Sequence, residues 1–300
     1  MNYILFNPKS NSENNDLNII PGKEELDRLG VKQISLIDVN VREFCASLVE
    51  GDRVLICGGD GTLHHFANNT RGIAFPCPVF LVRSGTGNDF LNDIGQTGNE
   101  DLVDIREYIN ELPTVEIDGE ERCFINGVGM GMDGEVCSKV EQYKQRTGKK
   151  ASYKLIALKL LAYKYKHPSA TVTVDGVEHH FDDVWMATAM HGRFFGGGMM
   201  IAPTQDRKSG KLSVMVMHGG SRAKILSIFP SVYKGKHIKH TDIVTVFECD
   251  EVTVSYNGVP LAFQADGETK PAIYTYTARS VSSLKKAKTE SAEETLTPSI

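Results

Sequence analysis

The sequence predicts an α/β N-terminal domain with a parallel sheet, followed by a β-sandwich-like second domain. In residues 1–115 short apolar runs alternate with helical patterns, which is typical of strands joined by helical crossovers. Residues 116–282 carry many short β-like runs at close spacing. Three hundred residues with 41% hydrophobic content are enough for two cores of this kind.

The first domain is expected to contain four strands. Each strand run is apolar, and turn residues such as Asn7-Pro8 or a glycine loop follow it. One stretch between these runs has the apolar spacing of a helix. The strands are expected at residues 3–6, 31–37, 53–57 and 79–83, and the helix at 41–50.

The second domain is expected to be built from short strands with two helices between them. Asp175-Gly176 predicts a tight hairpin, because both residues tolerate a positive φ. Residues 283–300 are charged and small, so we expect a disordered tail. The strands are expected at 123–127, 171–174, 178–181, 184–190, 212–217, 243–247, 252–256 and 273–277, and the helices at 152–165 and 221–234.

Composition excludes several classes of protein. The net charge of −5 argues against a general nucleic-acid binder. Six dispersed cysteines without a CxxC pair indicate free thiols in a reducing cytosol rather than a disulfide framework. No signal peptide and no run of 18 apolar residues is visible, so we expect a cytoplasmic protein that contacts membranes peripherally at most.

Two glycine-rich loops follow predicted strands. Gly58-Gly59-Asp60-Gly61-Thr62 comes after the strand at 53–57, and Ser84-Gly85-Thr86-Gly87-Asn88-Asp89-Phe90 after the strand at 79–83. Glycines allow the backbone to approach a phosphate closely, and amides at a helix start point toward it. A lone loop of this kind would as readily be a ligand-free turn, but two at the carboxyl edge of one sheet predict a nucleotide site.

Asn7-Pro8, GGDGT at 58–62 and SGTGNDF at 84–90 together resemble the catalytic domain of diacylglycerol kinases and related sphingosine, ceramide and bacterial lipid kinases. The likeness runs from about residue 3 to 277 and implies a first domain like those of NAD kinase and phosphofructokinase. It also implies ATP and Mg²⁺ as cofactors. Nucleotide contacts are then expected from Asn7, Pro8, Gly59, Asp60, Gly61, Thr62, Ser84 and Thr86, with Gly58, Gly85 and Asn88 shaping the loops.

The same resemblance implies the catalytic carboxylates. Glu268, in an Asp-Gly-Glu element, matches the family's proton acceptor, and Asp266 would lie on the same side of an extended segment. Asp60 and Asp266 are the candidate Mg²⁺ ligands. Taken without the resemblance, residues 266–268 would more readily be read as a polar hairpin turn.

Two departures from the family pattern are visible. Some bacterial members hold a structural Mg²⁺ in a segment like 202–211 through a carboxylate and two main-chain carbonyls, which here would belong to Asp206 and Lys211. Ser209 stands in the place of that carboxylate, so we expect no metal there. His64-His65 replaces an Asn-Glu pair, and neither it nor His179-His180 has the geometry of a zinc site.

Two apolar segments of the second domain are relevant to the chemical nature of the acceptor. The segment at 194–200, FFGGGMM, is equally compatible with a loop lining an acyl-chain cleft and with a bulged core strand. The helix at 152–165 has two apolar stripes, one of them flanked by lysines. That second stripe fits the core, a second subunit in a homodimer, or anionic lipid headgroups.

The resemblance and these residues predict an ATP-dependent lipid kinase that phosphorylates a hydroxyl of diacylglycerol or a related lipid at a membrane surface. A NAD kinase-like phosphotransferase is the alternative, weakened because Asn99-Glu100 lies in a polar linker. A non-catalytic protein that binds a nucleotide or a lipid is the third reading, against which Glu268 argues.

Overall fold

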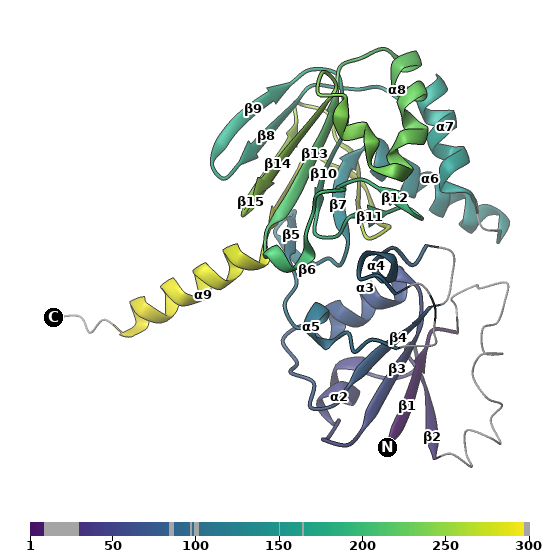
Figure 1. Ribbon diagram of the computed structural model, residues 1–300, viewed down its shortest axis with the longest axis vertical. Coiled ribbons are helices and arrows are strands. Elements are labelled where there is room, and N and C mark those ends of the chain that lie inside the picture. Colours follow the sequence, from purple (N-terminus) through teal and green to yellow (C-terminus); the bar gives the residue numbers. More distant parts are fainter. Residues whose placement is uncertain are drawn as a thin grey trace. The chain divides into compact units, whose positions relative to one another are not determined.

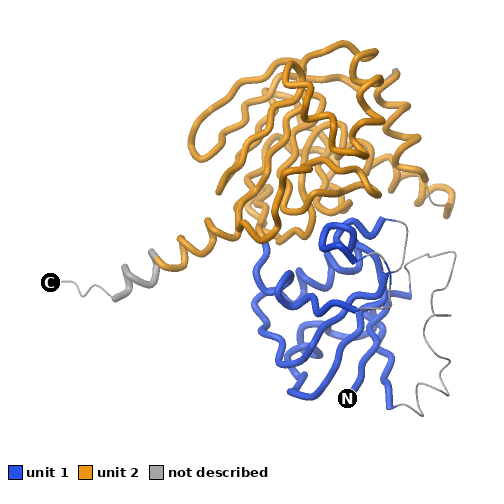
Figure 2. The backbone as a smooth tube through the Cα atoms, viewed as in Figure 1, with its two compact units in different colours: residues 1–112 blue, residues 113–300 orange. Residues whose placement is uncertain are grey.

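The computed structural model describes residues 1–8, 30–83, 87–96, 98, 102–149, 151–163 and 165–296, without the side chains of 163 and 290–296. The chain divides into two compact units, Met1–Leu112 and Pro113–Ile300 (Figure 2). The boundary expected from the sequence lies after residue 115. Each unit has its own sheet system and its own core, so each is described by itself.

Unit 1 is built on a parallel four-stranded sheet in the order β2-β1-β3-β4 (Figure 1). On the two inner strands, Leu5, Val54 and Ile56 are fully buried. This is the parallel arrangement that the alternating pattern predicts. The strands are β1 Asn2–Phe6, β2 Val31–Ser35, β3 Arg53–Gly58 and β4 Val79–Arg83.

Short helices connect and flank these strands. Helix α2 begins at Asn40, whose side chain accepts the amide hydrogen of Glu43. It ends well before residue 50, because Asp52 accepts the Val49 amide and Gly51 turns the chain at φ 92°. The helices of unit 1 are α2 Val41–Ala46, α3 Asp60–Asn69, α4 Asp89–Asp93 and α5 Arg106–Ile109.

Unit 2 is a sandwich of two six-stranded sheets in which neighbouring strands pair antiparallel. The first sheet has the order β14-β13-β10-β7-β16-β17, with β7 Gly127–Gly131, β10 Val184–Met190, β13 Leu212–His218, β14 Val244–Cys249, β16 Leu261–Ala265 and β17 Glu268–Ile273. The second has the order β6-β5-β18-β15-β8-β9, with β5 Thr114–Ile117, β6 Glu120–Cys123, β8 Ala170–Val174, β9 Val177–Phe181, β15 Glu251–Tyr256 and β18 Thr275–Arg279.

Helices cover the outer face of the first sheet and create a second core there (Figure 1). Every residue of β10 is therefore buried, because the other sheet covers one of its faces and the helices cover the other. Trp185 points into the helical core, and Ala187 into the core between the sheets. The covering elements are α6 Met132–Thr147, α7 Tyr153–Tyr163, α8 Arg222–Ile228 and the 3₁₀ segments η3 Phe229–Lys234 and η4 Lys236–Lys239.

The structure differs from the sequence-based elements at several points. Helix α6 was not expected, and residues 124–126 separate two strands instead of forming one. The strand expected at 273–277 is divided between β17 and β18. The helix expected at 221–234 changes to 3₁₀ geometry at Phe229, where Pro230 lacks the amide hydrogen that an α-helix needs.

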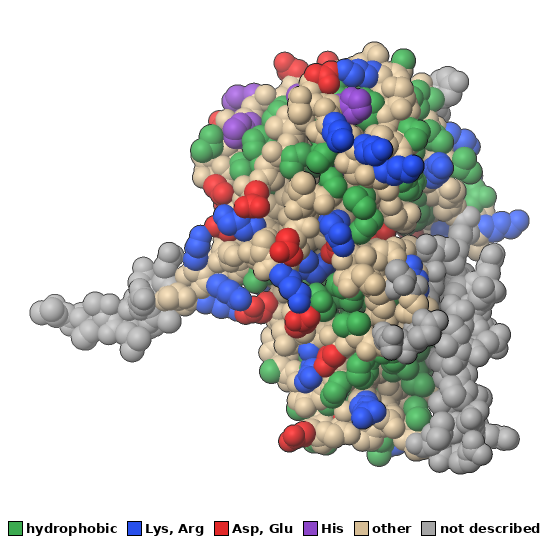
Figure 3. Space-filling view, in the orientation of Figure 1, with side chains coloured by type: hydrophobic (Ala, Val, Ile, Leu, Met, Phe, Trp, Pro, Cys, Tyr) green, Lys and Arg blue, Asp and Glu red, His purple; other side chains and the backbone are tan. Residues whose placement is uncertain are grey.

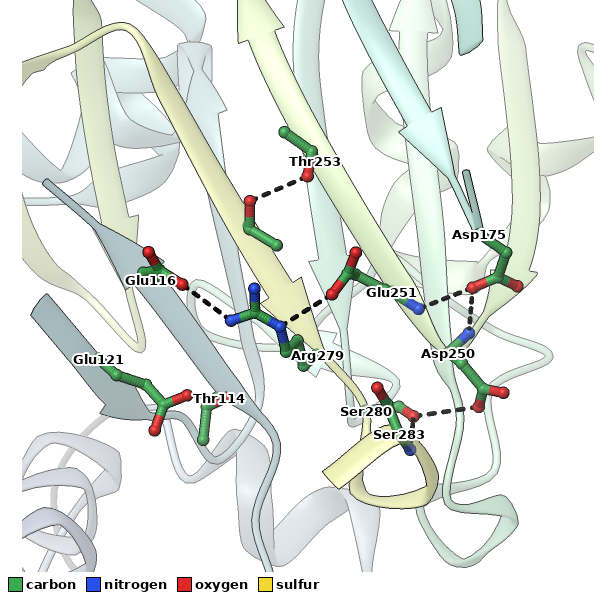
Figure 4. A network of polar contacts seen from close by, with 11 residues as sticks. Thr114, Glu116, Glu121, Asp175, Asp250, Glu251, Thr253, Arg279, Ser280 and Ser283 are labelled. Atoms are coloured by element: carbon green, nitrogen blue, oxygen red, sulfur yellow. Dashed lines mark hydrogen bonds and ion pairs between the residues drawn. The ribbon is translucent and has the colours of Figure 1, made fainter. Parts of the chain in front are cut away.

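The end of the chain also differs from its expectation. Helix α9, Val281–Leu296, occupies most of the segment expected to be disordered. Its start is fixed by Ser280, which accepts the Ser283 amide and donates to Asp250 (Figure 4). Lys286 donates to the same carboxylate. A capped start followed by Lys, Ala and Glu, which favour helices, explains a helix without an apolar face.

A polar network on the second sheet surrounds that helix start. Arg279 donates to Glu116 and to Glu251 at 2.9 and 2.8 Å, which joins β18 to its two neighbours β5 and β15 (Figure 4). Asp175, in the hairpin predicted from Asp-Gly, has φ 46° and accepts the amides of Asp250 and Glu251. These contacts stabilise the end of β18, the strand that α9 follows.

Candidate active site

The first glycine loop connects β3 to α3, and packing explains one of its glycines. A Cβ on Gly58 would lie 2.4 Å from the side chain of Thr62, which is buried against the end of β3. Gly58 therefore has a steric role at this turn. Thr62, expected to contact the nucleotide, is buried and its side chain packs against the end of β3.

Gly61 has a different environment. Its φ is not positive, and among the described residues no atom lies within 4 Å of a Cβ built on it. A glycine in a helix costs about 1 kcal/mol relative to alanine. Neither backbone geometry nor packing by the described chain explains this residue, and the space beside it suits a close-lying ligand.

Helix α3 begins without a side-chain cap at Gly59. The first amide groups of a helix have no partner within the helix, and the N-terminal end of its dipole favours anions. The adjoining strand β1 ends beside β3, with Phe6 opposite Cys57, so half-buried Asn7 and exposed Pro8 follow at the same edge of the sheet. This edge combines amides and a side-chain amide suited to phosphate.

Asp60 joins the two glycine loops. Its carboxylate accepts the amides of Asp89 and Phe90 at 3.0 and 2.9 Å, at the start of α4. Sequence reasoning proposed this carboxylate as a Mg²⁺ ligand. Both oxygens are engaged by the main chain, which gives Asp60 a positioning role, although each oxygen keeps a further lone pair.

The second loop is only partly described. Ser84, Gly85 and Thr86 lie outside the described residues. Asn88 precedes α4 in the left-handed conformation, φ 50° and ψ 41°, which Asn tolerates better than most residues. Arg83, which the sequence analysis did not single out, donates to the side chain of Asn92 in α4 at 2.7 Å. It also donates to the Gln96 carbonyl, just after that helix, at 2.9 Å.

In unit 2, Asp266-Gly267 forms the two-residue hairpin turn between β16 and β17, with φ values of 49° and 93°. The expectation that Asp266 and Glu268 share one side assumed an extended segment, and this turn replaces it. The Asp266 carboxylate accepts the amides of Ile125, Asn126 and Gly127 at 2.6, 2.8 and 3.1 Å. Asp266 was predicted as a metal ligand, but its carboxylate, like that of Asp60, binds main-chain amides.

Glu268 begins β17, and its side chain is exposed. Its charge acts on Cys137 of α6. Burial raises the pKa of that thiol well above its usual range, and the negative charges of Asp133 and Glu268 add to the effect. The predicted base therefore lies near α6, in the same neighbourhood as a second carboxylate.

That second carboxylate, Asp133, was missed by sequence reasoning. It is buried in the first turn of α6, and burial raises its pKa to about 6. Gln264 donates to its Oδ2 at 3.3 Å, and Oδ1 has no hydrogen-bond partner among the described residues. An Asp directly after an apolar strand at a helix start was the available signal.

Asp133 lines an apolar cavity of about 50 Å³ enclosed by the helical layer and the first sheet. The hairpin of β11 Phe194–Phe195 and β12 Met199–Met200 forms part of its wall, so the segment at 194–200 is a cavity-lining loop and not a bulged core strand. Three successive glycines with positive φ make its turn. The lining residues include Met132, Asp133, Val136, Cys137, Ala157, Phe195, Gly196, Met199, Met215, Phe229 and His237.

His237 is the other buried polar side chain of this lining. Its Nε2 lies 3.0 Å from the Ile201 carbonyl, and Nδ1 has no hydrogen-bond partner among the described residues. Burial lowers its pKa, which favours the neutral ring. The cavity therefore offers two isolated polar atoms within an apolar wall.

The segment at 202–211 has a donor where relatives are expected to hold a cation. The Gln205 amide donates to the carbonyls of Lys211, His191 and Asp206 at 2.9, 3.3 and 3.5 Å. Arg207 continues this support, because its guanidinium bonds the Ile125 carbonyl and the Asn126 side chain. The amide occupies the carbonyl oxygens that a structural Mg²⁺ would need, so these residues do not fit that metal.

The histidine pairs form no metal site in the part of the chain that the structure describes, where no cluster of three or more His, Cys, Asp or Glu side chains is suited to a metal. His64 is buried in α3 and its ring lies edge-on to His65 at 5.6 Å. The six cysteines form no disulfide bonds with one another. Among the described residues no helix has the length and apolarity to cross a bilayer.

Both units match models of known protein families. The model of the diacylglycerol kinase catalytic domain matches residues 2–118, and that of the YegS C-terminal NAD kinase beta sandwich-like domain matches residues 126–282. A diacylglycerol kinase of Mycobacterium tuberculosis is 26% identical over 227 residues, 71% of this chain and 72% of that protein. The Bacillus subtilis protein YtlR, provisionally named a lipid kinase, is 25% identical over 72% of this chain and 74% of its own length.

A solved structure shows the same fold. A provisionally assigned diacylglycerol kinase from Bacillus anthracis str. Sterne superimposes with a TM-score of 0.63 over 93% of this chain and 91% of that chain, at 16% identity. The two matched models together span nearly all of both units. The chain therefore belongs to the diacylglycerol kinase catalytic-domain family, a family of kinases.

Proposed function

We propose that this chain is an ATP-dependent lipid kinase that transfers the γ-phosphoryl group of ATP to a hydroxyl of diacylglycerol or a related lipid. The bond between the γ-phosphorus and the ADP oxygen breaks, a bond to the acceptor oxygen forms, and a base takes the hydroxyl proton. Family membership supports the kinase activity. The acceptor and the residue roles are proposed from the contacts and burial of the described residues.

The phosphate end of ATP is assigned to the loop of unit 1. The open space at Gly61 and the uncapped start of α3 support this assignment. Asp60 keeps the β3 loop and the start of α4 in a fixed relation. Mg²⁺ would enter with the nucleotide, since it commonly binds one or two carboxylates together with phosphate oxygens and waters.

The apolar cavity beside Asp133 carries the lipid assignment. A soluble acceptor such as a dinucleotide would need several polar partners, whereas this wall is almost wholly aliphatic, aromatic and methionine. Asp133 Oδ1 is buried without a hydrogen-bond partner among the described residues, which favours a polar group of the acceptor beside it. Cys137, which lines the cavity, is influenced by the charge of Glu268, so acceptor and base fall into one neighbourhood of unit 2.

Glu268 is the proposed base because its carboxylate is exposed while Asp266 is held by three amides. A base acts mainly in the transition state. We expect Glu268→Gln to lower kcat by about 100-fold or more, with little change in ATP affinity.

This expectation is checked by steady-state kinetics and by nucleotide titration of each variant. The matched control is Glu178→Gln, an exposed glutamate of β9 in the other sheet, which should keep full activity. An equal loss of ATP affinity and turnover in Glu268→Gln would remove Glu268 from the role of base.

The acceptor is tested with labelled ATP, Mg²⁺ and a panel of diacylglycerol, ceramide, sphingosine, phosphatidylglycerol, undecaprenol and NAD. Label in a lipid product supports the proposal. Label in NAD alone would replace it with the NAD kinase-like alternative, which the beta sandwich-like match also permits. No transfer to any acceptor, with ATP binding intact, would support the non-catalytic reading.

A further inference from the structure

Positive charge in this chain is concentrated in two stretches of unit 2. Residues 142–174 and 207–241 each contain eight Lys and Arg and no Asp or Glu, although the whole chain has a net charge of −5. Helix α7 lies in the first stretch, and α8, η3 and η4 lie in the second. The fold brings these elements together on the outer side of the first sheet.

Their outward surface is defined here as the basic helical face and consists of Lys154, Leu155, Lys159, Lys234, Lys236 and Lys239, all of them exposed. Figure 3 shows Lys and Arg side chains in a row beside apolar ones over the region that Figure 1 assigns to α7 and α8. Among the described residues none of these five lysines forms an ion pair with an acidic side chain. Lys224, by contrast, is paired with Asp242.

Leu155 gives this face an apolar component. It is 61% exposed, the highest value among the large apolar side chains exposed in the described chain. The opposite side of α7 is accounted for, since Ala157, Leu160 and Leu161 are buried in the helical core. Lysines around an outward leucine are typical of a helix lying in a membrane interface, where the ammonium groups meet anionic headgroups.

The same elements line the apolar cavity. Ala157 of α7, Ile225 of α8, Phe229 of η3 and His237 of η4 all contribute to its wall. A face built on these elements is in the right place for a water-insoluble acceptor, because a lipid that stays in its bilayer until it reaches the cavity never needs to cross water.

We propose that the basic helical face binds the surface of an anionic phospholipid bilayer and presents the cavity to it. The reason for such docking rests on the proposed lipid kinase function, but the binding itself does not require catalysis. Charge complementarity selects the partner: five exposed lysines without acidic neighbours on their own elements match anionic headgroups. A lysine near such a surface contributes roughly a 5-fold gain in partitioning.

The test measures co-sedimentation of the full chain with vesicles, without ATP. We expect binding to vesicles of phosphatidylcholine with phosphatidylglycerol, weak binding to phosphatidylcholine alone, and loss of binding at high salt. Lys154→Gln with Lys159→Gln should weaken partitioning by about 25-fold. Leu155→Glu should weaken it as well, because it removes the apolar contact and adds a negative charge.

Matched controls are Lys32→Gln with Lys285→Gln, which removes two exposed lysines elsewhere, and Val177→Glu, which places the same charge at an apolar residue 59% exposed on β9. Controls that weaken binding as much as the face variants would overturn the proposal. Equal binding to neutral and anionic vesicles would also overturn it. So would tight binding of soluble glycerol phosphate that prevents the chain from binding vesicles.

Kinase assays separate this proposal from the function on which it draws. With a short-chain acceptor dissolved in detergent, the face variants should keep wild-type turnover, because none of the substituted residues lines the cavity. Vesicle binding without any lipid phosphorylation would leave docking in place and remove the kinase proposal. Lipid phosphorylation without selective vesicle binding would remove docking alone.

Discussion

Three carboxylates of the candidate site have been given different tasks by their surroundings. Asp60 and Asp266 accept main-chain amides and fix loops, whereas Asp133 is buried next to apolar side chains with one oxygen unpartnered. The sequence alone could not separate them, because the separation depends on amides that are distant along the chain. Residue type identified candidates, and the hydrogen-bond partners decide their roles.

Asp133 should make stability depend on pH. Its pKa in the fold, about 6, lies above the ordinary aspartate value of 3.8, so the folded state retains the proton more strongly. The stabilising contribution is complete below pH ~3.8 and is lost as the pH rises through about 6, a change of about 3 kcal/mol. Asp133→Asn should therefore be more stable than the wild type at pH 7.5.

Urea denaturation at several pH values checks this expectation. The advantage of Asp133→Asn should grow between pH ~4 and ~6 and then stay constant. Asp38→Asn, which also removes one negative charge but at an exposed position, is the control. A difference between wild type and Asp133→Asn that does not change with pH would contradict the buried, proton-retaining carboxyl.

Asp60 should matter for ATP because it caps α4 from the neighbouring loop. Asp60→Ala removes the acceptor of two amides, and such capping losses cost about 1–2 kcal/mol. We expect both a lower melting temperature and weaker ATP binding. Asn40→Ala, which uncaps α2 away from the glycine loops, should lower the melting temperature without weakening ATP binding. Equal ATP affinity in the two variants would refute the positioning role.

At the scale of elements, the 202–211 segment shows how side chains can hold several main-chain carbonyls together. Gln205 gathers three carbonyls, and Arg207 extends the support to residues 125–127, which Asp266 holds from the other side. The turn that precedes Glu268 is thus supported from two directions by the chain itself.

This arrangement predicts stability that does not depend on divalent cations. Without nucleotide, the melting temperature of the wild type should be the same in Mg²⁺ and in EDTA. Gln205→Ala leaves the gathered carbonyls without their donor and should cost about 1–3 kcal/mol. Gln145→Ala, on the exposed side of α6, should cost little. A clear fall in the wild-type melting temperature in EDTA would show that a cation is needed after all.

Sequence reasoning performed unevenly across the elements. The strands β1, β3, β4, β8, β9 and β10 were placed within one or two residues, because their apolar runs end at turn residues. Helix α6 was missed because its charged, weakly apolar sequence is buried mainly along its first half. Its position depends on the sheet beneath it, and no local pattern carries that information.

For the whole molecule, the sequence predicted two domains, an α/β unit and a β-rich unit, and the structure has both architectures. The layer of helices on the outer face of the first sheet was not foreseen. That layer creates the apolar cavity, which no run of residues reveals because its wall is drawn from at least seven separate elements. The two glycine-rich loops, by contrast, are contiguous in sequence, so their residues could be named from it.

The methionines of this chain give the cavity a further property. Eight of the nine lie between residues 130 and 217, and Met132, Met186, Met199, Met215 and Met217 line the cavity. Unbranched thioethers change rotamer at little cost, so the wall can adapt to acyl chains of different length and unsaturation. The same sulfurs are open to oxidation, and a sulfoxide at partly buried Met199 would bring a strong dipole into an apolar wall. Acceptor tolerance and sensitivity to peroxide would then have one origin.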